Sequence, residues 1–304
     1  MRVLTDNVWS IEPGAMRKLA AAMARYGPAA GAAVTVEAGP AGDGQRDGLP
    51  LQVDRSGVAM VHLAGPMVKN PGVFGMIFGL AGTLAVRRAI EAAAADEAVG
   101  SILLRIDSPG GSVDGLAELG DAVYAAAQQK PVVAQVDGMA ASAAYYVASQ
   151  ATAIYAHRMD LIGSIGTRLM LYDWHRLFEK EGVEAVPIDT GEFKSAGALG
   201  TEITQSQRAD FQRIVDAYFE DFRAAIIRGR GLSVDAVNAV ADGRIWTATE
   251  AMAGGLGLID GIQPLERTLA DLQSRNIDQR RSRRASAVAR VAEREAAAAT
   301  KSSD

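Results

Sequence analysis

The sequence predicts an α/β fold in which helices flank a largely parallel β-sheet. Short apolar runs alternate with longer stretches of helical periodicity between residues 58 and 156, and such alternation favours parallel strands joined by right-handed crossovers. Apolar residues make up 49% and charged residues 22% of the 304-residue chain. This composition excludes a disordered chain and a polytopic membrane protein, and it supplies enough apolar surface for one large core.

The individual elements follow from periodicity and from the residues that interrupt it. Gly110 and Gly111, after Pro109, end the second apolar run, and Pro131 ends the helical pattern before it because proline lacks an N–H and clashes with the preceding turn. The strands expected on this basis are residues 58–63, 101–106, 132–136 and 153–156. The expected helices are residues 83–95, 116–128, 141–149, 174–181, 205–228 and 233–241.

The two ends of the chain differ from the middle. Residues 1–52 combine an amphipathic helical pattern at 11–26 with a flexible linker rich in Gly, Ala, Pro and Asp. Residues 53–273 are expected to form the folded domain. Residues 274–304 hold eight Lys or Arg against four Asp or Glu and few large apolar groups, which predicts a basic tail that is helix-prone or disordered.

Several classes of protein are excluded by scarce residue types. The chain has no cysteine, which excludes disulfides, thiolate nucleophiles and iron–sulfur clusters. Its three histidines lack metal-site spacing, so we expect no metal and no cofactor. The net charge of −5 argues against nucleic acid as a partner. The N-terminus lacks a secretory signal pattern, and the uncharged runs at 70–86 and 138–157 are interrupted by glycine or polar residues, so we expect no membrane span.

Residues suited to catalysis follow two of the predicted strands. Residues 107–113, Asp-Ser-Pro-Gly-Gly-Ser-Val, follow strand 101–106 at the sheet edge where ligands bind, and their glycines either expose N–H groups or form an ordinary tight turn. Ser142 follows strand 132–136 at the first turn of a helix, as a nucleophile or merely as a cap. Lys194 lies in a glycine-flanked loop, where it is either a solvated lysine or a base. A lysine becomes a base when burial in an apolar cleft favours its neutral form.

Five motifs occur in the order in which a known family has them. They are Asp107-Ser-Pro-Gly-Gly-Ser-Val113, Lys130-Pro-Val-Val133, the alanine-rich stretch 140–149, Gly163-Ser-Ile-Gly166 and Phe193-Lys-Ser-Ala-Gly197. Together with stretches 242–247 and 255–260, they closely resemble the signal peptide peptidase A family of serine peptidases, which includes a phage head-maturation branch. The resemblance extends from about residue 58 to about residue 270. It implies a Clp/crotonase-like fold, with a parallel sheet built from repeated β-β-α and βαβ units.

The resemblance assigns roles to five residues. Ser142 matches the family's nucleophile, Lys194 its general base, and Ser164 the serine that holds the lysine in place. The backbone N–H groups of Gly111 and Ala143 match the oxyanion hole. The implied reaction begins with attack of the serine on a peptide carbonyl while the neutral lysine takes the hydroxyl proton, and it continues by hydrolysis of an acyl-enzyme.

The chain departs from the family pattern at a few positions. Ala143 and Ala144 stand where bacterial members usually have glycine, and Thr167 stands where valine is usual, but neither change removes a catalytic group. Clp-type relatives use a Ser-His-Asp triad. His157 lies 15 residues after Ser142, and we interpret it as a polar residue at a strand end.

Residues 53–273 are therefore expected to be a serine peptidase domain that forms a homo-oligomer with the cleft between subunits. The N-terminal extension has no membrane helix, which favours a phage or prophage capsid assembly protease. The resemblance to this branch implies action in the host cytoplasm or the assembling procapsid on scaffold, portal or capsid proteins. A soluble bacterial signal peptide peptidase paralogue, an acyl-CoA enzyme on the same fold and a non-catalytic head-assembly protein are the alternatives. The apolar stretch 73–84 fits the core, a subunit contact or a lip over a substrate groove.

Overall fold

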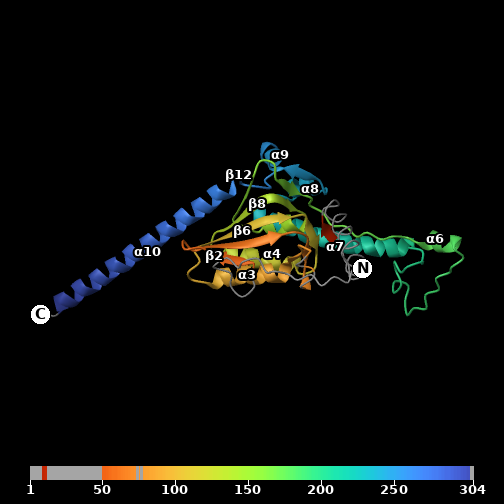
Figure 1. The fold of residues 1–304 in the computed structure, drawn as a ribbon, viewed down its shortest axis with the longest axis horizontal. Helices are drawn as coiled ribbons and strands as arrows, with labels where there is room; N and C mark the ends of the chain where they lie inside the picture. The colour runs from red at the N-terminus through yellow and green to blue at the C-terminus, as the bar shows by residue number, and fades with distance from the viewer. Residues whose placement is uncertain (1–8, 12–49, 73–74, 76–77, 302–304) are drawn as a thin grey trace.

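A mostly parallel, eight-stranded sheet with helices on both faces confirms the α/β class (Figure 1). The computed structural model describes residues 9–11, 50–72, 75 and 78–301. The strands are β1 Trp9–Ile11, β2 Leu51–Val53, β3 Val58–Ala64, β4 Met67–Val68, β5 Ala81–Gly82, β6 Ser101–Ser108, β7 Gly110–Ser112, β8 Val132–Ala141, β9 Ala153–Ala156, β10 Leu161–Gly163, β11 Ile245–Thr247 and β12 Gly261–Ile262. The helices are α3 Thr83–Ala95, α4 Leu116–Ala127, α5 Ala143–Ala148, α6 His175–Lys180, α7 Gln205–Arg230, α8 Val234–Val240, α9 Ala248–Ala253 and α10 Leu265–Lys301.

The order of the large sheet is β11-β10-β8-β6-β3-β2, with β9 beside β8 and β12 beside β9. Strands β3, β6, β8 and β10 are parallel neighbours, and the two edge strands β2 and β11 run antiparallel to them. The carboxyl ends of the parallel strands therefore meet at one edge of the sheet. This is the edge at which open α/β sheets bind their ligands.

Two apolar layers, one on each face of the sheet, explain the continuous apolar runs of the central strands. Ile102, Leu104 and Ile106 of β6 belong to the main core, which α3, α4 and α5 also line. Leu103 points to the opposite face and joins a smaller cluster with Leu272 of α10. A strand that is covered on both faces has no need of the polar residues that normally alternate with apolar ones.

The long helix α10 crosses the expected boundary between residues 273 and 274 without interruption. Its first turns pack on the sheet through Leu265, Leu269 and Leu272. The rest of the helix projects from the body as a rod (Figure 1). Among the residues that the structure describes, no helix combines the length and the apolar character needed to cross a bilayer.

Most predicted elements occur close to the expected positions. Helix α3 and strand β9 have the predicted ends, whereas β8 runs five residues further, to Ala141, and α5 begins two residues later than expected. Both differences arise at Ser142, whose φ of 56° interrupts the chain between strand and helix. Short strands of two or three residues were not predicted, because so few residues show no periodicity.

A second sheet, of four strands in the order β1-β7-β4-β5, lies next to the large one. Its first strand comes from the N-terminal segment, so Ile11 is in a strand and not at the start of the predicted helix. The remainder of that helix, and the linker that follows it, lie outside the described residues. So do residues 73–74 and 76–77 of the apolar stretch.

Candidate active site

Three motifs that are distant in sequence meet at the carboxyl edge of the sheet. Strand β8 ends at Ala141, which is the register partner of Gly163 in β10, and Gly163 is in turn the partner of Ile245 in β11. The backbone N–H of Ser142 donates to the carbonyl oxygen of Gly163 at 2.7 Å. The structure thus brings Ser142 and Ser164 together from neighbouring strands.

Both serines have a backbone conformation that side chains rarely adopt. Ser142 has a φ of 56° and a ψ of −123°, and Ser164 has a φ of 50°. In the described part of the chain they are the two residues other than glycine that have positive φ. Such strain costs on the order of 1–3 kcal/mol per residue and is concentrated at functional sites. A nucleophile at a sharp strand-to-helix turn is one recurrent example.

The side chain of Ser142 does not have the capping role that the sequence left open. Ser142 is the N-cap residue of α5, but its hydroxyl makes no capping hydrogen bond with the first turn of this helix. The residue is 2% exposed. The arrangement therefore holds the Ser142 hydroxyl at the edge of the core without using it to stabilise the helix.

The segment before β11 fixes Ser164. The N–H of Ser164 donates to the carbonyl oxygen of Arg244 at 2.7 Å, and the N–H of Gly243 donates to Ile165 at 3.0 Å. A side chain at Gly163 would collide with the ring of Trp246. The later motif at 242–247 therefore supports the conformation of the Gly-Ser-Ile-Gly motif.

Each glycine of the pair that follows β6 is favoured at its position for a different physical reason. Gly110 has a φ of 89°, a conformation that favours glycine, whereas a side chain at Gly111 would collide with the backbone of Met67 in β4. Helix α5, which begins at Ala143, lies against β7, which carries Gly111. The two predicted oxyanion-hole residues are therefore on neighbouring elements.

Ser108 shapes this turn, and the sequence analysis assigned it no role. Its buried hydroxyl donates to the carbonyl oxygen of Gly65 at 2.7 Å and accepts from the N–H of Gly110 at 3.2 Å. A serine two residues before a glycine in a turn is the available sequence signal, because its hydroxyl bonds nearby backbone. Ser108 thus holds the backbone of the turn at Gly110, the residue before Gly111.

Two tyrosines hold α5 in place. Tyr145 donates its hydroxyl to the carbonyl oxygen of Leu258 at 2.9 Å, and Tyr146 donates to Asp221 of α7 at 3.0 Å. The ring of Tyr146 lies 5.4 Å from that of Phe222. Burial raises the pKa of both tyrosines well above the usual value, so both keep their protons and act as donors.

Asp160 anchors the backbone on the other side of β8. Its carboxylate accepts from the N–H of Gly138 at 3.1 Å and from that of His157 at 2.6 Å. Burial raises the pKa of Asp160 above its usual range, although these two hydrogen bonds act in the opposite direction. His157 is exposed directly after β9, in agreement with its interpretation as a strand-end residue.

Lys194 lies in a loop on the surface of the single chain. Its loop is held at the start of α7, where Gln207 donates to the carbonyl oxygen of Glu192. Two other residues of α7 contact the serine motifs: Val215 accepts from the hydroxyl of Thr167 at 2.9 Å, and Asp221 accepts from Tyr146. They lie eight and fourteen residues after Gln207, roughly 12 and 21 Å along the helix at 1.5 Å per residue. Lys194 is exposed, so the apolar cleft expected around it is absent from the described residues of a single chain.

The loop of Lys194 is part of an arm, residues 168–204, whose helix α6 lies beyond the end of α7 that points away from the body (Figure 1). Large apolar side chains are unusually exposed on this arm, with Ile188 at 96%. They are Met170, Tyr172, Trp174, Leu177, Val183, Val186, Ile188, Phe193 and Leu199. So many exposed apolar side chains in one segment indicate a protein contact surface.

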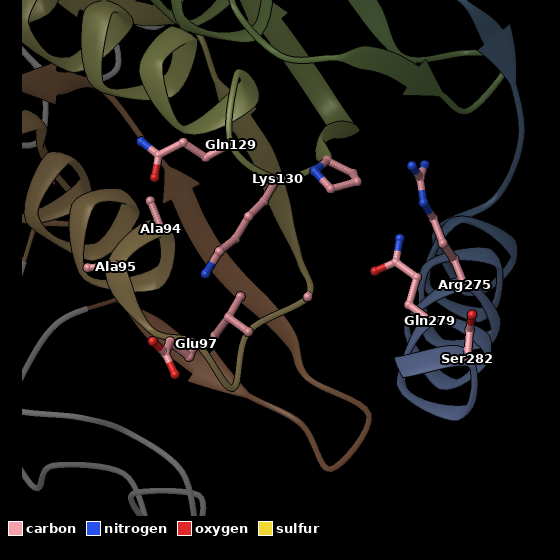
Figure 2. A pocket seen from close by; sticks show the side chains of 11 residues that line it. Ala94, Ala95, Glu97, Gln129, Lys130, Arg275, Gln279 and Ser282 are labelled. Carbon is pink, nitrogen blue, oxygen red and sulfur yellow. The ribbon is translucent and has the colours of Figure 1, made fainter. Parts of the chain in front are cut away.

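A cavity of about 850 Å³ lies away from these motifs. Figure 2 shows Arg275 and Gln279 of α10 on one side of it and Lys130, three residues after α4, on the other, with the Lys130 amine directed toward the end of α3, where it donates to the carbonyl oxygen of Ala93. Gly100 and Pro131, which precede β6 and β8, also line it, so the cavity is at the amino edge of the sheet. It is therefore not part of the site that contains Ser142.

Comparison with known proteins shows which family the chain resembles. The family model "Peptidase family S49" matches residues 125–277, which is half of the chain. Three relatives are a putative protease of Methanocaldococcus jannaschii (32% identity; 59% of this chain, 57% of the relative), the head-tail preconnector protein GP5 of Enterobacteria phage P21 (31%; 73% and 42%) and the capsid assembly protease C of Escherichia phage lambda (29%; 70% and 48%).

The chain thus spans about half the length of these relatives. Among solved structures, an enoyl-CoA hydratase/isomerase family member aligns with a TM-score of 0.41 at 18% identity, over 77% of this chain and 74% of that one.

Proposed function

The chain belongs to peptidase family S49, and from this membership we propose that residues 53–273 form a serine endopeptidase with a Ser-Lys dyad. Ser142 is the nucleophile, Lys194 the general base and Ser164 the residue that positions the lysine. The observation that carries the proposal is the hydrogen bond from Ser142 to Gly163, the residue before Ser164. It links two serines, Ser142 and Ser164, whose backbones are both strained. A strained backbone costs free energy of folding, and a serine with a purely structural role does not require it.

The reaction follows from this placement. The Ser142 hydroxyl attacks the scissile carbonyl, and neutral Lys194 accepts its proton. The N–H groups of Gly111 and Ala143 stabilise the oxyanion, and loss of one such donor costs roughly 2.7–4 kcal/mol in the barrier. Lys194 then returns the proton to the leaving amine, and water hydrolyses the acyl-enzyme.

We assign the base to a neighbouring copy of the chain in a homo-oligomer. The exposure of Lys194 supports this assignment, because an exposed lysine lacks the apolar surroundings that favour its neutral, basic form. The apolar arm supports it as well, since it offers a surface for a second copy to cover. Contact between subunits would also exclude water around Lys194 and favour its neutral form.

We infer that the substrates are proteins of a phage or prophage head, namely scaffold, portal or capsid proteins, cleaved in the host cytoplasm or procapsid. The support is similarity to a phage preconnector protein over 73% and to a phage capsid assembly protease over 70% of this chain. A bacterial paralogue would share the chemistry and differ in its substrate.

Three single variants test the dyad in the full chain. Ser142→Ala and Lys194→Ala are each expected to abolish cleavage of a labelled polypeptide, whereas His157→Ala keeps it. Intact-mass measurement of the purified chain and its Ser142→Ala variant gives a second readout, because self-cleavage needs no known substrate. An active Lys194→Ala enzyme together with an inactive His157→Ala enzyme would overturn the proposal.

A further inference from the structure

The strand β1, near the N-terminus, lies antiparallel to β7, the strand that carries Gly111 (Figure 1, red ribbon). Every residue of β7 has a partner in β1: Ser112 pairs with Trp9, Gly111 with Ser10 and Gly110 with Ile11. The other edge of β7 is already used, because Gly111 also pairs with Met67 of β4. Strand β1 therefore occupies the edge of β7 that β4 leaves open.

An extended polypeptide binds most simply to such an edge. Adding a strand to an exposed edge satisfies backbone groups along the whole segment, and it requires no particular side chains. If Gly111 supplies an oxyanion N–H, the carbonyl that reacts has to come close to Gly111. The register position of Gly111 is held by Ser10, so β1 and a substrate segment cannot use this edge at the same time.

The covalent connection makes β1 a strong competitor. Residues 12–49 link it to the rest of the folded chain. Covalent attachment through a linker that can span the two sites gives a tethered segment an effective concentration on the order of millimolar. A polypeptide substrate at micromolar concentration then has to displace an occupant that is always present.

We propose that the segment Trp9–Ile11 is a built-in occupant of the substrate-binding edge of β7, where it competes with polypeptide substrates. This inference rests on the proposed function, since it takes the edge beside Gly111 as the place where substrate binds. The chemical class that replaces β1 is an extended, unfolded polypeptide segment.

Two variants weaken or remove the pairing of β1 with β7. Deletion of residues 1–11 removes the strand itself. Ser10→Pro keeps the segment but removes the backbone N–H of residue 10 and fixes its φ, which disfavours pairing in a β-ladder. Ser10→Thr is the matched control, because it keeps the N–H and favours an extended backbone. With fluorescein-labelled casein as substrate, we expect the deletion and Ser10→Pro to lower KM by about fivefold or more, with kcat within about twofold, and Ser10→Thr to match the parent.

Amide hydrogen exchange at Gly110–Ser112 provides a readout that does not depend on activity. In a Ser142→Ala background, exchange is expected to be slow in the full chain and faster after deletion of residues 1–11. A synthetic peptide of residues 5–15 added to the deletion variant is expected to restore protection. If KM and exchange are unchanged by deletion, or if deletion lowers kcat while KM stays constant, the inference is wrong. If no variant cleaves casein while exchange still responds to deletion and peptide, the occupant is real and the peptidase assignment fails.

Discussion

The N–H of Ser142 donates to the carbonyl oxygen of Gly163 at 2.7 Å, and this bond joins the end of β8 to the residue that precedes Ser164. The two serines are therefore fixed by backbone geometry and not by flexible side chains. A site built in this way is rigid on one side, where Ser142, Ser164 and Gly111 come from the sheet. The proposed base, Lys194, is instead on an exposed loop near the start of α7.

Co-assembly of two inactive variants is expected to restore cleavage. If each site takes Ser142 from one copy and Lys194 from the next, a mixed oligomer of Ser142→Ala and Lys194→Ala subunits contains some sites with both native residues. In a random equimolar mixture this is about one site in four. Labelled-polypeptide cleavage by the mixture, unfolded and refolded together, measures it. A mixture as inactive as its separate components would contradict assembly of the site from two copies.

Glycine at position 142 is expected to give a more stable protein than alanine does. Both variants lose the hydroxyl, but alanine retains the strain of positive φ, so we expect Ser142→Gly to exceed Ser142→Ala by about 1 kcal/mol in the free energy of unfolding. Ser149 is the matched control, because its φ is −61°. There the order is reversed, with glycine less stable by about 0.5–1 kcal/mol. Urea denaturation of the four variants checks the prediction, and the same order at both positions would refute it.

Ser108→Ala is expected to reduce kcat by about tenfold or more with little change in KM, because the turn that presents Gly110 and Gly111 loses two hydrogen bonds. The loss of stability should be about 1–3 kcal/mol. Ser101→Ala, at the other end of β6, is the control. The Ser101 hydroxyl is buried and has no hydrogen-bond partner among the described residues, so its removal should be neutral or stabilising. Equal kinetic effects of the two variants would show that Ser108 has no positioning role.

The stability of the protein is expected to depend more strongly on Asp54 at neutral pH than in acid. Burial by itself would raise the pKa of Asp54, but hydrogen bonds from Ser56, Gln273 and the N–H of Val58 lower it below its usual value. A carboxylate with a lowered pKa in the folded state stabilises the fold above its unfolded pKa of about 3.9, and this contribution is lost as the pH falls through the folded pKa.

We therefore expect Asp54→Asn to lower the free energy of unfolding by about 1–2 kcal/mol at neutral pH, with a smaller difference near about pH 3. Gln273→Ala is a partial control, since it removes the bond from α10 alone. Urea denaturation at the two pH values measures the difference. A gap between Asp54→Asn and the parent that does not change with pH would contradict this account.

The sequence predicted the elements whose periodicity is long enough to be recognised. Helix α3 has the expected ends, and α7 is two residues longer than expected. The sequence also placed Ser142 in the first turn of a helix, and it left open whether that serine caps the helix. In the structure, β8 extends to the residue before Ser142, and the helix begins at the residue after it. Periodicity could not decide this question, because a cap and a strained nucleophile occupy the same position in a strand-to-helix turn.

The sequence by itself determined the α/β class, the order of the motifs and the scarcity of possible bases, because each is a property of residues read along one segment. Tertiary structure alone decided that Gly163 lies beside Ser142, that Lys194 is on an exposed loop near the start of α7 and that β1 covers β7. The physical reason is that these relationships depend on hydrogen bonds and packing between segments that are far apart in the chain. Local patterns record whether a residue is buried, but not which distant strand buries it.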